Sequence, residues 1–464
     1  MKIKHLAGIV GMALALAACG NSNTGSKDNG DRISFDKNPY PSTYEPAASG
    51  TLFITGATIL DGVGGKIDSG SVIVTNGRIT AVGADLEAPE GAETIDASGR
   101  WVTPGIIDNH SHLGVYASPG VNAHSDGNEV TGPVTAEVWA EHGIWPQDPG
   151  FTRALAGGVT SMQILPGSAN LFGGRGVTVK NVASRTVQGM KFPGAPYTLK
   201  MACGENPKRV YGSRRQPPGS RMGNFAGYRA SWIKATDYKR KWEKYEKEGG
   251  TPPTRDLELD TLAGVLNGEI LVHMHCYRAD EMAQVLDMSK EFGYKVTAFH
   301  HGVEAYKIAD LLAESGTCAA IWADWWGFKM EAYDGVRENL PLVHQAGACA
   351  ITHSDDPTGI QRLNQETAKA WAYGRKVGID ISQADAWAWL SANPAKSLGI
   401  FEETGSLEEG KAADLVIWST DPFSVYAKAD QVYIDGVKSF DRTTPDANPV
   451  TDFELGQPGE GDVK

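Results

Sequence analysis

Short apolar runs alternate with amphipathic segments through the middle of this 464-residue chain. Apolar side chains recur three and four residues apart over 279–292, 303–315 and 337–345, which predicts a helix in each segment. The apolar runs between them have the length and composition of buried strands. This alternation predicts an α/β fold in which residues 104–405 form a (β/α)8, TIM-like barrel.

The two ends of the chain have a different pattern, in which apolar and polar residues alternate as in half-buried strands. Residues 71–79 are typical, since Asn-Gly lies between two alternating runs, and similar strands return at 415–418. Each terminal segment is too small to be stable alone. We therefore predict that residues 50–103 and 406–440 pair into one small β-sandwich beside the barrel.

The chain opens with two lysines and an apolar segment over 6–18, which is shorter than a comfortable membrane span. This pattern predicts a signal peptide over residues 1–18. The Leu-Ala-Ala-Cys sequence that ends at Cys19 resembles a bacterial lipobox, in which the cysteine becomes the lipid-carrying N-terminus. The alternative is an ordinary cleaved signal followed by a chance cysteine. Gly20 resembles the residue found in lipoproteins sorted to the outer membrane of Gram-negative cells.

Residues 19–49 are rich in Gly, Asn, Ser, Asp and Pro, so we expect a flexible tether there, and a flexible tail over 441–464. The lipid on Cys19 is then the expected membrane contact, and it places the protein on the periplasmic side of the envelope.

The formal net charge is −13, which disfavours binding to nucleic acid because phosphate backbones are also negative. The sequence leaves a homo-oligomer open. Besides Cys19 there are four cysteines, too few for a disulfide scaffold, so we interpret them as buried thiols, with the first two near the site: Cys203, Cys276, Cys318 and Cys349.

Histidines stand at the ends of several apolar runs. His110 and His112 end the run that begins at Pro104, and side chains two apart in a strand project to the same side. Two imidazoles in that arrangement suit a metal ion. Later runs end in further candidate ligands: His273 and His275, His300 and His301, and His353 with Asp355.

This order of motifs resembles the amidohydrolase superfamily of metal-dependent hydrolases, with the strongest likeness to its imidazolonepropionase-like and prolidase-like branch. The lead-in over 104–108 and the segment over 409–416 are similar to the family's first barrel strand and closing strand. The resemblance implies a divalent metal, zinc being the first choice, as one or two ions per chain. It implies six ligands: His110, His112, Lys200, His275, His301 and Asp355.

Three of these assignments have competitors. His275 is preferred to His273 because it lies nearer the C-terminal end of its strand, where a barrel opens. His301 is preferred to His300 because His-Gly at the strand end resembles the family motif. Lys200, as a carboxylated lysine that bridges two ions, is preferred to two alternatives, Lys180 and Glu205.

The implied reaction is hydrolysis of a carbon–nitrogen bond in a small amide, such as a dipeptide or an N-acyl amino acid. A metal ion would lower the pKa of water toward 7, and Asp355 would act first as general base and then as general acid. Tyr277 would stabilise the oxyanion and Arg278 would pair with a substrate carboxylate, although both could instead hold the barrel rim.

Two other functions compete with this one. The first is deamination or cyclic-amide ring opening by a mononuclear member of the same fold. The deaminase-like branch has a glutamate three residues after the fifth-strand histidine, where this chain has Arg278. The second is a catalytically silent envelope protein that binds a ligand, which the complete ligand set disfavours.

Overall fold

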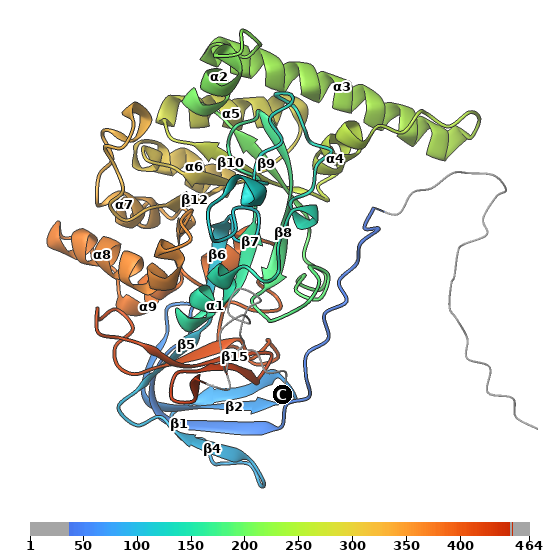
Figure 1. The fold of residues 1–464 in the computed structure, drawn as a ribbon. Coiled ribbons are helices and arrows are strands. Elements are labelled where there is room, and N and C mark those ends of the chain that lie inside the picture. The colour runs from blue at the N-terminus through green and yellow to red at the C-terminus, as the bar shows by residue number, and fades with distance from the viewer. Residues whose placement is uncertain (1–36, 446–447, 449–464) are drawn as a thin grey trace, which may run out of the picture.

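The computed structural model describes residues 37–445 and residue 448. The predicted signal peptide, Cys19, the first part of the tether and most of the tail lie outside the described residues. Figure 1 shows two parts: a sheet built from both ends of the chain, and a larger strand-and-helix domain above it.

The terminal sheet interleaves the two ends of the chain. β14 lies between β5 and β15 and pairs antiparallel with both. The predicted pairing of the terminal segments is confirmed, although hydrogen bonds join all the strands into one sheet where we expected two stacked sheets. The strands are β1 (Thr51–Leu60), β2 (Lys66–Thr75), β3 (Arg78–Gly83), β4 (Glu93–Asp96), β5 (Trp101–Pro104), β14 (Leu415–Trp418), β15 (Ala429–Ile434) and β16 (Val437–Asp441).

The second sheet is an eight-stranded, nearly closed barrel whose strands follow one another in space as they do in sequence. The predicted TIM-like barrel is therefore confirmed. Its strands are β6 (Ile106–Ser111), β7 (Val159–Ile164), β8 (Phe172–Lys180), β9 (Thr198–Ala202), β10 (Leu271–Cys276), β11 (Val296–His301), β12 (Cys318–Ile321) and β13 (Ala350–Thr352).

One barrel strand departs from the all-parallel plan. β8 runs antiparallel to both β7 and β9, whereas the other neighbouring pairs in the barrel sheet are parallel. The connection from β7 to β8, residues 165–171, is too short for a parallel crossover, which needs about a dozen residues. β8 therefore forms an antiparallel hairpin with β7, and its backbone runs in the direction opposite to that of both neighbouring strands.

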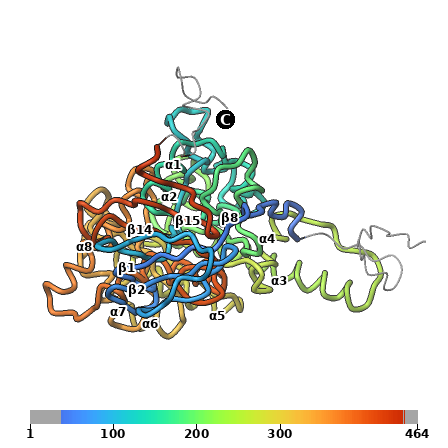
Figure 2. The backbone as a smooth tube through the Cα atoms, turned by 90° about the horizontal axis from the view of Figure 1, so that it is seen from below, coloured from blue at the N-terminus to red at the C-terminus, as the bar shows by residue number. Residues whose placement is uncertain are grey.

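Helices cover the outside of the barrel, and α5 has the bounds predicted from its periodicity. α3 is 28 residues long and projects from the body of the molecule (Figure 2). No helix within the described residues is long and apolar enough to cross a membrane. The helices are α1 (Pro149–Ala156), α2 (Glu205–Gly212), α3 (Arg221–Glu248), α4 (Leu257–Leu266), α5 (Ala279–Phe292), α6 (Ala309–Ser315), α7 (Asn339–Gln345), α8 (Leu363–Lys376), α9 (Gln383–Trp387) and α10 (Ala392–Ser397).

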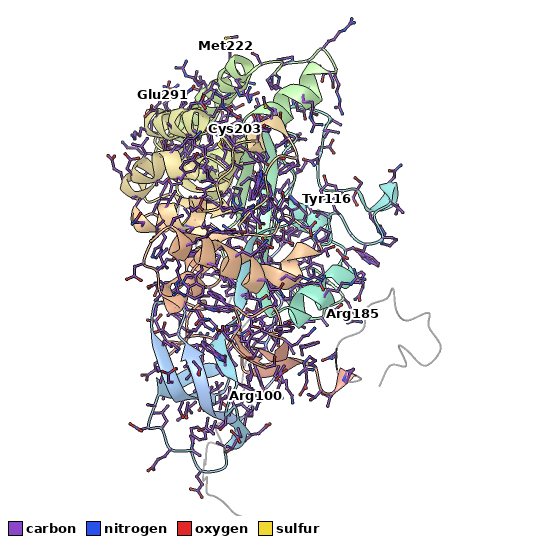
Figure 3. The ribbon with its side chains drawn as sticks, turned by 90° about the vertical axis from the view of Figure 1, so that its left-hand side faces the viewer. Arg100, Tyr116, Arg185, Cys203, Met222 and Glu291 are labelled. Carbon is purple, nitrogen blue, oxygen red and sulfur yellow. A yellow bond between two sulfur atoms is a disulfide. The ribbon has the colours of Figure 1, made fainter. Side chains whose placement is uncertain are left out.

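The interpretation of the cysteines as buried thiols was wrong, because the four form two disulfides. Cys203 bonds Cys276, and Cys318 bonds Cys349, with Cα atoms 5.2 and 4.4 Å apart. Each bond joins the ends of neighbouring parallel strands in register: Ala202 faces His275 one residue before the first pair, and Ala319 faces Ala350 one residue after the second. Figure 3 places Cys203 in the barrel half of the molecule, far from Arg100, which lies just before β5 of the terminal sheet.

The described part of the predicted tether lies against the barrel. Thr43 N donates to the carbonyl of Gln188 at 3.0 Å, and the Tyr44 hydroxyl donates to Asp435 at 2.6 Å. Lys191 donates to the carbonyl of Tyr40 at 2.7 Å. Residues 37–50, which we call the N-terminal strap, thus run from the terminal sheet up the side of the barrel (Figure 1).

Candidate metal centre

A group of imidazoles, one lysine and one aspartate meets at the end of the barrel where several strands finish. The strands bring these residues together because the C-terminal ends of neighbouring parallel strands share one edge of the sheet. β6 and the residue after it supply His110 and His112, β9 supplies Lys200, β10 supplies His273 and His275, β11 supplies His300 and His301, and the loop after β13 supplies His353 and Asp355.

His110, His112 and Asp355 form the tightest part of this cluster. The two Nε2 atoms are 3.2 Å apart, and Asp355 Oδ1 lies 3.4 Å from His110 Nε2 and 3.1 Å from His112 Nε2. Two ligands held at about 2.0–2.1 Å in a tetrahedral zinc site are about 3.3 Å apart. The three predicted ligands therefore have the mutual spacing of donors to one ion, and their donor atoms lie within 4.8 Å of one another.

A chain of hydrogen bonds decides which nitrogen of His110 faces this group. His273 Nε2 lies 3.0 Å from the carbonyl of Ser397, which only accepts, so His273 carries its proton there. His273 Nδ1 then accepts from His300 Nε2 at 2.8 Å, and His300 Nδ1 accepts from His110 Nδ1 at 2.8 Å. His110 is thereby left with an unprotonated Nε2 directed at Asp355.

His112 is oriented in the same way. Its Nδ1 lies 2.8 Å from the carbonyl of Leu165 and donates to it, so its Nε2 is also unprotonated. Two nitrogen lone pairs and a carboxylate oxygen then face one another at little more than 3 Å. A cation between them, either a proton or a metal ion, relieves their repulsion, so this donor set fits a divalent metal.

Burial keeps the surrounding imidazoles neutral. It lowers the pKa of His110, His275, His300 and His301 well below the usual value, and nearby Lys200 or neighbouring imidazoles add to the effect at His110 and His300. The pKa of His273 falls to about 3 and that of His353 to about 4, again chiefly through burial. Neutral imidazole is the form that binds metals.

A second group of donors adjoins the first. His110, His301 and His353 place donor nitrogens within 4.8 Å of one another, and His353 Nε2 lies 3.0 Å from His301 Nδ1. His353 stood among the candidate ligands at strand ends, but it is not one of the six ligands that the family resemblance implies. His275 lies beside this group, with its ring 4.6 Å from that of His301, and its buried Nδ1 lacks a partner among the described residues.

The structure separates the three candidates for a bridging ligand. Lys200 is buried, and its Nζ lies 3.4 Å from His110 Nε2. Lys180 pairs instead with Asp435 of the terminal sheet at 2.7 Å, and Glu205 pairs with Lys329 at 3.4 Å. Burial lowers the pKa of Lys200 to about 8, against the opposing effect of Asp355. A neutral amine is therefore accessible at this position near neutral pH.

Asp355 is both the last ligand candidate and the most accessible acid of the group, with 26% of its side chain exposed. Burial alone would raise the pKa of Asp355, but its hydrogen bond with His112, made when a proton lies between the two side chains, holds it below the usual range. Asp355 and His301 both have positive φ, at 52° and 73°. Such backbone strain costs about 1–3 kcal/mol per residue and is common where a side chain must be aimed into a site.

Asp108 supports the cluster from behind, and the sequence analysis missed this role. Its carboxylate accepts from His110 N at 3.1 Å and from Ser354 N at 3.2 Å, and also from the Ser354 hydroxyl. Asp355 N donates to the carbonyl of His110 at 3.1 Å. These bonds tie β6 to the loop after β13 at the seam of the barrel. Burial raises the pKa of Asp108 to about 7.

The two residues predicted to act on substrate lie in different surroundings. The Tyr277 ring stacks on His301 at 5.2 Å, and burial raises its pKa, so the phenol keeps its proton. Arg278 is 44% exposed and donates to Asp280 at 2.9 Å, an ion pair at the surface and outside the cluster. A residue not singled out earlier, Lys329, lies over the Tyr277 ring at 3.9 Å.

Comparisons with known proteins agree with this geometry. Residues 101–451 match the model of the amidohydrolase family. An amidohydrolase of Hapsidospora irregularis, tasK, is 34% identical over 405 residues, or 82% of this chain; the chain spans 41% of that relative's length. An imidazolonepropionase of Mesorhizobium japonicum is 26% identical over 78% of this chain and 90% of its own length. The crystal structure of an amidohydrolase from Thermotoga maritima MSB8 superposes with a TM-score of 0.78 at 38% identity, covering 84% of this chain and all of that one.

Proposed function

The chain belongs to the amidohydrolase family, whose members hydrolyse carbon–nitrogen bonds, and from this premise we propose that it cleaves the amide bond of a small molecule such as a dipeptide or an N-acyl amino acid. The observation that supports a catalytic role is the convergence of His110 Nε2, His112 Nε2 and Asp355 Oδ1 within 3.4 Å of one another. A protein that only bound a ligand would not need this donor set.

We propose zinc as the metal, with His110, His112 and Asp355 as the ligands of a first ion. His275 and His301 are the proposed ligands of a second ion, and Lys200 is the proposed bridge. A neutral Lys200 amine can add to carbon dioxide and release one proton, and the resulting carbamate has two oxygens. When bound, the metal would supply a Lewis acid that acidifies water and polarises a carbonyl group.

Asp355 is the proposed proton carrier. Its Oδ1 faces His112, while Oδ2 lies 3.8 Å from His301 and is the freer oxygen. Because the pKa of Asp355 is held low, the carboxylate is ionised near neutral pH and can accept a proton from the attacking water at Oδ2. The same oxygen then gives the proton to the leaving nitrogen. Tyr277, a neutral donor beside His301, is placed to stabilise the oxyanion.

Ring opening of a cyclic amide is the second candidate. The likeness to imidazolonepropionase over 78% of this chain favours it over deamination. Arg278 occupies the position at which deaminase-like members have a glutamate, and it bonds Asp280 on the surface.

A turnover screen tests the proposal. The zinc-loaded protein should release amine from at least one member of a panel of dipeptides and N-acyl amino acids, with a cyclic-amide panel run in parallel. Turnover of the cyclic panel alone would replace the first candidate with the second. Ammonia release from amino-purines or amino-pyrimidines, with no amide turnover at verified metal content, would refute both.

We also propose that the protein is lipid-anchored on the periplasmic side of the envelope, at the outer membrane. Two observations support this proposal: the lipobox-like sequence at Cys19, and two disulfides, which persist in oxidising compartments. Cys19→Ser should release the protein from membranes without loss of fold. Mass spectrometry that finds an unmodified Cys19 in the wild-type envelope fraction would contradict the proposal.

A further inference from the structure

A cavity of about 820 Å³ lies on the flank of the barrel, and none of the imidazoles of the metal centre lines it. Its walls come from β8, α3, α4, the loop before β9 and the first residues of the N-terminal strap. Figure 1 shows α3, α4 and the strap, in dark blue, on the same side of the molecule. The volume is in the range of small-molecule sites, about 300–1,000 Å³.

Arg175 is the one charged group in the cavity wall that comes from the barrel sheet itself. It lies in the reversed strand β8 and is 7% exposed. Its Nε donates to the Thr261 hydroxyl at 2.8 Å, and its guanidinium carbon lies 4.2 Å from the centre of the Trp139 ring and 5.5 Å from that of Tyr197. Within the part of the chain that the structure describes, it forms no ion pair.

The carboxylates around Arg175 are engaged by other cations. Asp260 and Glu141 are close enough to influence its pKa, yet each pairs elsewhere. The ion pairs are Asp260 with Arg255 at 2.7 Å, Glu141 with Lys191 at 3.0 Å, Glu269 with Lys37 at 2.6 Å and Glu243 with Lys239 at 3.8 Å. Burial consequently lowers the pKa of Arg175, as expected for a cation removed from water without a bonded anion.

We propose that this cavity is a second ligand site, which binds a small carboxylate attached to a flat aromatic ring. A carboxylate can accept two parallel hydrogen bonds from a guanidinium group and would complete the charge pairing of Arg175. Aromatic walls suit the rest of such a ligand, because Trp139 and Tyr197 flank Arg175 and the side chains of Tyr238 and Trp242 face the cavity from α3. The site is independent of the proposed hydrolytic reaction.

Calorimetric titration with 2-naphthoate tests the proposal on the full-length protein, both zinc-loaded and metal-free. Equal one-to-one binding is expected in the two forms, because the metal centre does not line the cavity. Arg175→Gln should weaken binding at least about tenfold, since it removes the positive charge and the paired hydrogen bonds that a guanidinium group gives a carboxylate. Arg229→Gln, an exposed position on α3 that pairs with Glu291, is the matched control and should bind like wild type. The uncharged 2-naphthamide should bind at least about tenfold more weakly than the carboxylate.

A second variant keeps the test decisive if Arg175→Gln fails to fold. Asn267→Trp places a large side chain at an exposed position on the cavity rim, and it should abolish binding while leaving the melting temperature unchanged. Three outcomes overturn the proposal: equal affinity for naphthoate and naphthamide, loss of binding when the metal is removed, or no binding to wild type.

Discussion

His110 Nδ1 lies 2.8 Å from His300 Nδ1, and this contact determines that the other nitrogen of His110 faces Asp355. His300 is not itself directed at the metal centre. It connects His110 through His273 to the carbonyl of Ser397, at the end of α10. A backbone carbonyl at a helix end therefore sets the tautomers of three imidazoles that are linked by hydrogen bonds, those of His273, His300 and His110.

His300→Phe should lower zinc affinity about 10- to 100-fold, because loss of a partner that orients a ligand typically has an effect of that size. The measurement is a competitive titration against a coloured chelator. His124→Phe, in a turn held by Pro119, is the control. Unchanged affinity in His300→Phe would show that His110 needs no orienting partner.

Asp355→Asn should reduce turnover about 10²- to 10⁴-fold with the fold retained, since an amide keeps the shape but does not carry a proton near neutral pH. The comparison is made at equal metal content. Asp356→Asn is the neighbouring control: Asp356 Oδ1 accepts from Thr358 N at 2.9 Å, and an amide oxygen can accept the same bond. Wild-type turnover in Asp355→Asn would refute the proposed proton carrier.

Lys200→Met should reduce bound zinc from two ions to one, as measured by elemental analysis. The matched variant is Lys180→Met, whose parent lysine is also buried but pairs with Asp414 and Asp435. That variant should keep both ions and lose about 3–5 kcal/mol of stability, because it leaves buried charges unpaired. Two bound ions in Lys200→Met would refute Lys200 as the bridging ligand. One bound ion in Lys180→Met would favour Lys180 in its place.

The metal-free protein should lose stability as the pH falls below about 6.5. Burial lowers the pKa of the clustered histidines in the folded state, to about 3 for His273 and about 4 for His353, so the unfolded chain takes up protons first. Each of these histidines contributes its full stabilisation above about pH 6.5. Between about pH 6.5 and its lowered pKa, each histidine reduces the free energy of unfolding by about 1.4 kcal/mol per pH unit. Urea unfolding at pH 7, 6 and 5 measures the slope, and His273→Gln should reduce it. Constant stability over this range would contradict the burial argument.

Periodicity and strand-end position predicted much of the structure. They predicted the barrel, the bounds of α5, and the approach of His110, His112 and Asp355, because each depends on local pattern and on the common edge of parallel strands. The direction of β8 was not predictable, since strand periodicity is the same in both directions.

Features that depend on contacts between strands were also missed. The bond between Cys203 and Cys276 requires the register of β9 against β10, which the sequence alone does not specify. The orienting role of His300 requires the rotamer of a buried ring and its distance to His110. Asp108 contacts Ser354 across 246 positions of sequence, so no local signal marks it.

The insertion of β14 between β5 and β15 has a consequence for biosynthesis. β5 is made early, yet its antiparallel partner is not synthesised until the barrel strands have all left the ribosome. Until β14 arrives, β5 presents an unpaired edge, and exposed edges invite association with other chains. A nascent or truncated chain that ends before Leu415 would therefore need chaperones to protect the edge of β5, even though it already contains all the barrel strands.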